Sequence, residues 1–334
     1  MRHFVIVGIL VVVVTVLAYV ALDSAGLMPL AASAQAGPID WLWNLEVMTI
    51  SFLFALIIVP MGYSLVVFRR RKGDTTDAEH IEGNTNLEIT WTVVPLFIVM
   101  VFAFLGAGNL SEIRRVDPDA LVVRVNGFQW AWSFEYPTFG VTSTELHLPV
   151  GRQVLLQMTS NDVIHSFWVP EFRVKQDLVP GRITELRITP TVIGNYMVRC
   201  AELCGTAHAY MEGPVVVSSQ EDFNIWMDEQ VALAEEQAAT PEGRGQVLVA
   251  VNGCAACHSI NGAAGIGPTW LGLFGRQETL TDGSVITVDE EYIHESIVAP
   301  QARIVAGFEN QLMPTYNFTD EQTADIIAYI KTLQ

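Results

Sequence analysis

The stretch Cys200-Ala201-Glu202-Leu203-Cys204-Gly205-Thr206-Ala207-His208-Ala209-Tyr210-Met211 brings two thiols, an imidazole and a thioether into one short segment. His165, in the sequence His-Ser-Phe-Trp-Val-Pro, adds a second imidazole from upstream. Thiolates, imidazoles and thioethers are soft ligands, and this set is suited to copper. A mononuclear blue-copper site uses one cysteine, so the second cysteine indicates two copper ions that share both sulfurs.

Two other interpretations use the same residues. A zinc site could take both cysteines and both histidines and leave Met211 as core packing. A disulfide between Cys200 and Cys204 is possible outside the cytoplasm. The complete spacing of the five side chains favours copper over both.

The chain around this segment is rich in short β-type runs. Residues 121–125, 153–158 and 183–188 are enriched in β-branched residues and are separated by Pro-Gly turn signals. Such a pattern, with no long helical period, predicts a β-sandwich or barrel of about 100 residues.

Three apolar stretches precede this domain: Phe4–Leu22, Val47–Phe68 and Trp91–Gly108. Each approaches the roughly 20 residues that span a bilayer core. The basic run Arg69-Arg70-Arg71-Lys72 follows the second stretch, so the positive-inside rule places this run in the cytoplasm. Everything after Gly108 is then expected on the extracytoplasmic side.

The first stretch has two interpretations. The small-residue tract at 31–36 resembles a signal-peptidase site, so residues 1–36 are either a cleaved signal peptide or a retained first transmembrane helix. The remaining boundaries predict a two-helix transmembrane hairpin at 37–110 and the β domain at 111–217. An acidic helix and linker at 218–241 and a further domain at 242–334 complete the chain.

Over roughly residues 40–217 the chain resembles subunit II of cytochrome c oxidase. The resemblance is carried by the His165–Arg182 segment and by the Cys-x-Glu-x-Cys-Gly-x-x-His-x-x-Met pattern. It implies a Greek-key cupredoxin barrel that holds the binuclear copper centre called CuA. The ligands that it implies are His165, Cys200, the Glu202 carbonyl, Cys204, His208 and Met211.

The same resemblance implies roles for three more groups. The Glu202 side chain matches a contact to magnesium shared with subunit I. Trp130, in Gln129-Trp130-Ala131-Trp132, matches the residue where electrons enter, although Ala131 stands where relatives often have an aromatic residue. Glu88 matches a glutamate at the mouth of a proton path, and its alternative interpretation is a solvated charge that caps the following helix.

The C-terminal third contains Cys254-Ala255-Ala256-Cys257-His258, the attachment signature of a c-type haem. The two thiols would bond the vinyl groups and His258 would bind the iron. A thioredoxin-like redox pair is the competing interpretation, but it needs a βαβ setting that the sequence does not indicate.

The sixth iron ligand is expected further along the chain. Met313 precedes a predicted last helix that begins at Asp320 with Thr319 as N-cap, whereas the rival His294 falls within another probable helix. Residues 242–334 resemble an all-α class I cytochrome c. By this resemblance the carbonyl of Pro268 supports His258, and Gly245 and Tyr329 mark the crossing of the first and last helices.

Together the resemblances imply subunit II of a bacterial haem–copper oxidase with a fused cytochrome c domain. Electrons would pass from haem to copper and on to subunit I, where dioxygen is reduced to water with proton translocation. Implied partners are subunit I, subunit III, an electron donor such as cytochrome c, and the lipid of the plasma membrane. The alternative is a membrane-tethered haem and copper carrier that serves another terminal reductase.

Composition agrees with a membrane protein and excludes one class of partner. Of the 334 residues, 51% are hydrophobic and 16% charged, and the net charge of −18 excludes general nucleic-acid binding. The acidity is concentrated after Val217, where 17 acidic and 4 basic residues lie. We expect this acidic segment to attract a basic soluble donor.

Overall fold

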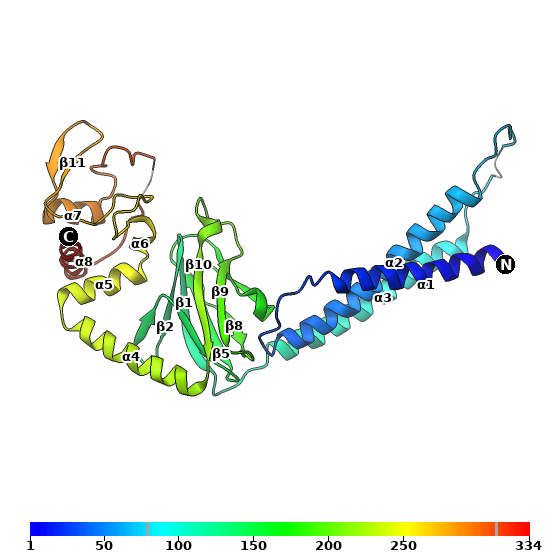
Figure 1. The fold of residues 1–334 in the computed structure, drawn as a ribbon, viewed down its shortest axis with the longest axis horizontal. Coiled ribbons are helices and arrows are strands. Elements are labelled where there is room, and N and C mark those ends of the chain that lie inside the picture. The colour runs from blue at the N-terminus through cyan, green and yellow to red at the C-terminus, as the bar shows by residue number, and fades with distance from the viewer. Residues whose placement is uncertain (78–79, 311–312) are drawn as a thin grey trace. The chain divides into compact units, whose positions relative to one another are not determined.

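The computed structural model describes residues 1–77, 80–310 and 313–334. They form two compact units, Met1–Arg115 and Val116–Gln334. Figure 1 shows the order of their elements along the chain.

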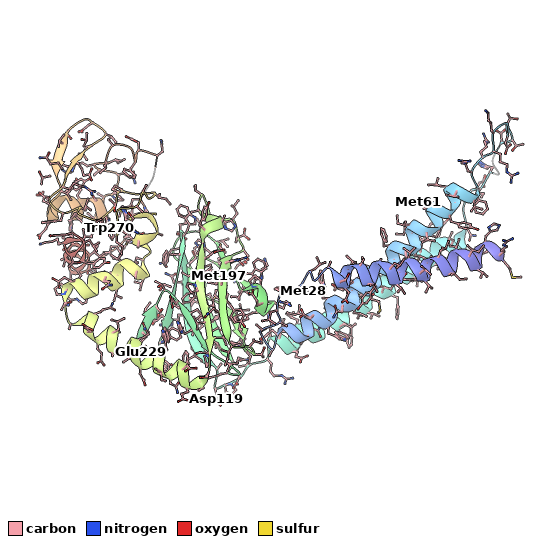
Figure 2. All side chains as sticks on the ribbon, in the orientation of Figure 1. Met28, Met61, Asp119, Met197, Glu229 and Trp270 are labelled. Atoms are coloured by element: carbon pink, nitrogen blue, oxygen red, sulfur yellow. The ribbon has the colours of Figure 1, made fainter. Side chains whose placement is uncertain are left out.

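The first unit consists of long apolar helices: α1 (Arg2–Ser24), α2 (Ala36–Val67) and α3 (Thr85–Ile113). Within the described ranges these are the three helices long and apolar enough to cross a membrane, and they contain the three predicted stretches except Phe68, which is the C-cap of α2. Most of their large apolar side chains are exposed, as expected of helices that contact lipid. Figure 2 shows these side chains projecting along the helices.

The second unit begins with two five-stranded sheets, ordered β3-β2-β1-β5-β8 and β4-β10-β9-β6-β7. Their inner faces bury large side chains that include Trp132, Phe134, Leu156 and Phe167. The predicted β domain is therefore confirmed, with a cupredoxin-like architecture. The strand bounds are β1 Leu121–Phe128, β2 Ala131–Tyr136, β3 Val141–Ser143, β4 Leu146–Pro149, β5 Val154–Ser160, β6 His165–Trp168, β7 Lys175–Leu178, β8 Thr184–Ile188, β9 Gly194–Cys200 and β10 Glu212–Ser218.

Alternating sequence explains why these strands form. Along β5 every second residue from Val154 to Ser160 is buried, so one side of the strand faces the core. Strands β1 and β5 pair in parallel, and β1 and β2 pair antiparallel. Short 3₁₀ turns, η1 (Pro170–Phe172) and η2 (His208–Tyr210), lie in the loops.

Helix α4 (Gln220–Ala238) follows the last strand and packs against the sandwich. Ser219 caps it by accepting a hydrogen bond from the Asp222 amide. Its Phe223 and Met227 are buried, and its Trp226 stacks on His147 with ring centroids 3.8 Å apart. The predicted acidic helix is confirmed, and its apolar side covers the β domain.

The C-terminal domain is helical, with α5 (Pro241–Val251), α6 (Cys254–Cys257), α7 (Glu290–Val298) and α8 (Asp320–Thr332). Its core is apolar and includes Trp270, Ile293 and Ile326; Figure 2 labels Trp270 in this domain. Helix α8 begins at Asp320 with a capping box from Thr319, as predicted. A short hairpin, β11 (Gln277–Thr279) and β12 (Val285–Thr287), interrupts the otherwise helical domain and was not predicted.

The first and last helices of this domain cross closely. A Cβ added to Gly245 would collide with the backbone of Asp325 and would lie 2.9 Å from Cβ of Tyr329. Only glycine allows this approach. The predicted crossing at Gly245 and Tyr329 is therefore observed.

Candidate metal centre and haem pocket

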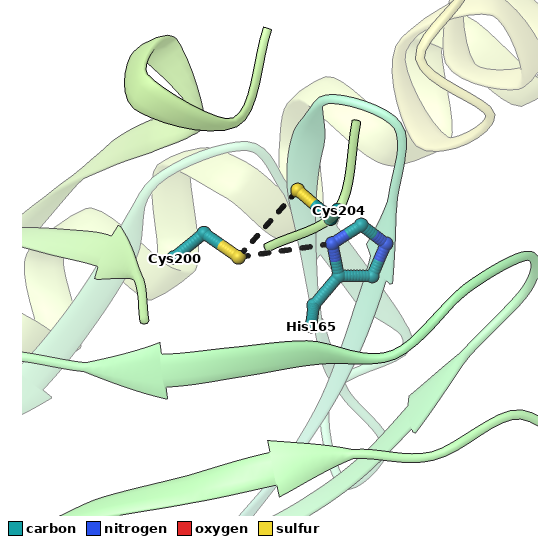
Figure 3. Close-up of side chains that lie close together, drawn as sticks. All are labelled: His165, Cys200 and Cys204. Atoms are coloured by element: carbon teal, nitrogen blue, oxygen red, sulfur yellow. Dashed lines mark hydrogen bonds between the residues drawn. The ribbon is translucent and has the colours of Figure 1, made fainter. Parts of the chain in front are cut away.

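The donor atoms of the copper motif lie together at one end of the sandwich. The Sγ atoms of Cys200 and Cys204 are 3.7 Å apart, and the Cys200 sulfur lies 3.9 Å from Nδ1 of His165. Figure 3 shows these three side chains converging. Among the described residues, their ligand atoms form a group close enough to hold a metal ion.

The other predicted donors surround the same two sulfurs. Nδ1 of His208 lies 3.5 Å from the Cys204 sulfur, and Sδ of Met211 lies 3.8 Å from it. The carbonyl oxygen of Glu202 is 3.1 Å from the Cys200 sulfur. All six predicted ligand groups are thus brought into one cluster.

The backbone explains why a short loop can build this cluster. Cys200 ends strand β9, and Met211 comes directly before β10, its neighbour in the sheet. The Cys200 amide donates to the Met211 carbonyl at 3.1 Å, so the two ends of the loop are joined. His165 starts strand β6, which pairs with β9. The sheet register therefore places a distant histidine beside the loop.

The geometry also bears on the two alternatives. All four cysteines lie within the described part of the chain and are free thiols. The separation of 3.7 Å between Cys200 and Cys204 is far from the roughly 2.05 Å of a disulfide. Met211 is fully buried with its sulfur on Cys204, so a four-residue zinc site would leave a fifth donor unused.

Ionisation of the two thiols is unequal. Burial raises the pKa of Cys200, but hydrogen bonds from His165 and nearby groups outweigh it and lower this pKa to about 6. Burial, and then the charge of Cys200, raise the pKa of Cys204 to about 12. Two adjacent thiolates are stable only with positive charge between them. The donor set therefore fits bound metal cations.

Asp162 positions the histidine ligand and was missed by sequence analysis. Its Oδ1 lies 2.8 Å from Nε2 of His165, and its carboxylate also accepts from the amides of Gln129 and Val163. The bond leaves Nδ1 of His165 directed at Cys200, since carboxylates of this kind orient metal-binding imidazoles. Its position three residues before His165 is the sequence feature that could have indicated a carboxylate bonded to this histidine.

The predicted electron-entry residue lies against the copper loop. Nε1 of Trp130 donates to the carbonyl of Cys204 at 3.1 Å, and Nε2 of Gln129 donates to the same oxygen at 2.6 Å. Gln129 was not singled out in the sequence. Both half-buried side chains are therefore joined to the backbone of a predicted ligand.

The haem motif borders a cavity of about 350 Å³. Cys254, Cys257 and His258 line this cavity, and so does Met313. His294 does not line it, although it lies in α7 as predicted. Met313 is therefore better placed than His294 to act as the sixth ligand.

His258 is held in the manner that the resemblance implied. Its Nδ1 lies 2.8 Å from the Pro268 carbonyl, and its ring stacks on Trp270 with centroids 5.0 Å apart. Burial lowers the pKa of His258, against the effect of the Pro268 hydrogen bond. A neutral imidazole with one nitrogen bonded to a carbonyl presents its other nitrogen as a ligand.

The two thiols of the motif remain protonated. Burial raises the pKa of Cys254 to about 11 and also raises the pKa of Cys257. Together with the apolar cavity wall, these groups fit a haem held by both cysteines and by His258.

Of the two predicted carboxylates, Glu88 lies outside these sites and Glu202 lies within the copper loop. Glu88 lies in the first turn of α3, where its Oε1 accepts a hydrogen bond from the Asn84 amide at 3.3 Å. This is the capping arrangement named as its alternative interpretation. The Glu202 side chain is exposed beside the copper loop.

The fold and the two sites define a membrane-anchored metalloprotein in which a cupredoxin-like domain precedes a cytochrome c domain. The chain is 37% identical over 265 residues to cytochrome c oxidase subunit 2 of Synechocystis sp., covering 65% of this chain and 79% of that protein. It belongs to this family: it is subunit II of a haem–copper oxidase and carries a cytochrome c domain.

Family models match three parts of the chain. They are the transmembrane domain of cytochrome c oxidase subunit II at residues 21–106, its periplasmic domain at 141–220, and cytochrome c at 243–334. The transmembrane match contains all of α2, most of α3 and only the end of α1. Family membership implies copper, haem and a complex with other subunits such as subunit I. It favours the oxidase over the tethered carrier.

Two further comparisons extend the similarity. Cytochrome c oxidase subunit 2 of Alkalihalophilus pseudofirmus is 29% identical over 318 residues, which is 91% of each chain. The crystal structure of the periplasmic domain of the Bradyrhizobium japonicum subunit II is 30% identical, with a TM-score of 0.33, and the match covers 35% of this chain and 96% of that one.

Proposed function

We propose that this chain receives electrons at a covalently held c-type haem, passes them to a binuclear CuA centre, and delivers them to subunit I. There dioxygen is reduced to water with proton translocation. When bound, the haem and the copper pair each supply a one-electron redox centre. The protein contributes the ligands, their spacing and the exclusion of water.

The cluster of soft donors is the observation that carries this proposal. His165, Cys200, Cys204 and His208, with Met211 and the carbonyl of Glu202, would hold two copper ions. The separation of the two sulfurs, 3.7 Å, suits thiolates that bridge two ions. Trp130 would provide the entry point for electrons, since it contacts the backbone of Cys204.

The haem would be attached through Cys254 and Cys257, with His258 and Met313 as iron ligands. Support comes from the cavity that all four residues line. Methionine ligation raises the potential of a haem relative to two histidines.

The remaining roles are drawn from the resemblance. Glu202 would contact magnesium shared with subunit I, and Glu88 would lie at a proton-path entrance. Subunit III, a soluble or membrane electron donor and the lipids of the bacterial plasma membrane would be further partners. We divide the chain into membrane hairpin, CuA domain, acidic linker and cytochrome c domain at residues 37–110, 111–217, 218–241 and 242–334.

Metal analysis of the purified full chain tests this proposal. We expect two coppers and one iron per chain, a mixed-valence copper EPR signal, and a haem that stays on the chain after acid extraction. One copper, or zinc in its place, would overturn the copper assignment. A haem that is extracted would overturn the role of Cys254 and Cys257.

A further inference from the structure

The haem-attachment helix begins against the β domain. Gly253 is the N-cap of α6 and directly precedes Cys254. Its φ of +70° is a left-handed conformation that favours glycine. A Cβ added here would lie 2.5 Å from Cδ2 of Phe128 and closer still to Cε2. This glycine is therefore required both by its backbone and by the ring that covers it.

Phe128 is the last residue of strand β1, and only 5% of it is exposed. The residues that follow it, Gln129 and Trp130, are the two that bond the Cys204 carbonyl. The contact therefore links the haem motif to the copper loop. Gly253 directly precedes Cys254, and Phe128 directly precedes the two residues that hydrogen-bond the Cys204 carbonyl.

The surroundings of this contact belong to both domains. Gln129, Trp130 and Thr206 line the same cavity as Cys254 and Cys257. Burial raises the pKa of Tyr316, and so do Cys254 and Cys257 and, to a smaller extent, Asp162 of the β domain. The β domain therefore forms part of the wall of the haem cavity.

We propose that Phe128 and Gly253 are positioning residues whose contact holds the haem-attachment helix on the copper domain, with the haem cavity facing Trp130. This inference rests on the proposed electron path from haem to copper. In that path the haem held by His258 and Met313 would give up one electron, and the copper held by Cys200 and Cys204 would accept it. Orientation of this kind replaces a diffusive encounter with a fixed one.

The test compares two glycine-to-alanine variants of the full chain. Gly253→Ala adds a methyl group against Phe128. Gly272→Ala is the matched control: its φ is +61°, it lies in the same domain, and it has open space around it. Both variants carry the strain of alanine at positive φ. Only the first disturbs the contact.

Two readouts are measured on each purified protein. The first is hydrogen exchange of residues 128–130 and 254–258, followed by mass spectrometry. The second is the rate of haem-to-copper electron transfer after flash reduction of the haem. For Gly253→Ala we expect faster exchange in both segments and a rate lower by about tenfold or more, with metal content unchanged. Gly272→Ala should match the unsubstituted chain in both.

Phe128→Ala provides an independent variant in case Gly253→Ala does not bind haem. It should produce the same increase in exchange at 254–258. In the double variant Phe128→Ala/Gly253→Ala the added methyl group meets no ring, so the two effects should not add. Equal behaviour of Gly253→Ala and Gly272→Ala, or unchanged exchange at 254–258 in Phe128→Ala, would overturn the inference.

Different measurements test the proposed electron path and the interdomain contact. If the unsubstituted chain transfers no electron from haem to copper, the proposed function fails. The exchange measurements still decide whether the contact holds the domains together.

Discussion

The indole nitrogen of Trp130 is hydrogen-bonded to the backbone carbonyl of Cys204, with 3.1 Å between nitrogen and oxygen. A half-buried aromatic residue is thereby joined to the backbone of a proposed copper ligand. Gln129 donates to the same oxygen. The position of the aromatic ring and the shape of the copper loop therefore depend on each other.

Trp130→Phe should separate these two roles, because it keeps an aromatic ring and removes the donor. We expect a loss of about 1 kcal/mol in unfolding free energy and a changed copper EPR signal. Denaturant unfolding and EPR of the full chain measure both. Trp226→Phe, which alters the ring stacked on His147 rather than the loop, is the control and should leave the copper signal unchanged.

Asp162→Asn should change how the stability of the metal-free protein depends on pH. Burial lowers the pKa of His165, but Asp162 and then Cys200 outweigh it and raise this pKa to about 9, above the ordinary 6.5. A raised histidine pKa stabilises the fold fully below pH 6.5, and this stabilisation is lost as the pH rises through 9.

The unsubstituted protein should therefore exceed Asp162→Asn in stability at pH 6 by about 1–3 kcal/mol, and this advantage should shrink towards pH 9.5. Urea unfolding of the copper-free protein at both values measures it. Glu145→Gln is a suitable control, since burial lowers the pKa of its partner His147. An advantage that is constant with pH would contradict the explanation.

Met313→Ala should lower the haem potential and alter the visible spectrum, because the cavity would lose its thioether. His294→Ala should change neither, since His294 does not line the cavity. Spectroelectrochemistry of the two purified variants gives the comparison. The opposite pattern would assign the sixth ligand to His294.

Asp325 and Arg244 join α8 to α5 through two hydrogen bonds, of 2.7 and 2.8 Å. Asp325 is 5% exposed but the Arg244 side chain is 37% exposed, so Asp325→Asn should cost about 1 kcal/mol by weakening two hydrogen bonds to a buried carboxylate. Glu295→Gln removes the charge from the more exposed pair with Arg303 and should cost less than about 1 kcal/mol. Thermal unfolding followed by haem absorbance measures both.

Oxidation of a basic soluble donor should slow as salt is added, because ions screen attraction to the acidic C-terminal segment. Stopped-flow rates over a range of ionic strength measure this effect. A neutral donor of similar potential serves as the control and should show little change. Rates for the basic donor that stay constant with salt would remove the acidic segment from donor recognition.

Features carried by consecutive residues were predictable from sequence. The loop from Cys200 to Met211 and the pentapeptide at Cys254 each contain most of their chemistry in a few positions, and the three membrane helices follow from hydropathy alone. The cap of α8 at Thr319 was predictable because capping depends on neighbouring residues.

Features that depend on distant backbone contacts were not predictable. The side chain of Gln129 donates a hydrogen bond to the Cys204 carbonyl, 75 residues away in sequence. Asp162 accepts a hydrogen bond from the Gln129 amide, 33 residues away. Strands β11 and β12 have three residues each, too few for an alternating pattern to be recognised. The contact between Phe128 and Gly253 joins two domains, and no local sequence pattern in either domain predicts it.

The cavity wall drawn from two domains has a thermodynamic consequence. Unfolding of the β domain and of the cytochrome c domain would be thermodynamically coupled, since opening the β domain removes Gln129, Trp130 and Thr206 from the surroundings of Cys254 and Cys257. Copper binding and haem attachment then stabilise each other, although they use separate residues. Loss of one cofactor would lower the melting temperature of the domain that holds the other.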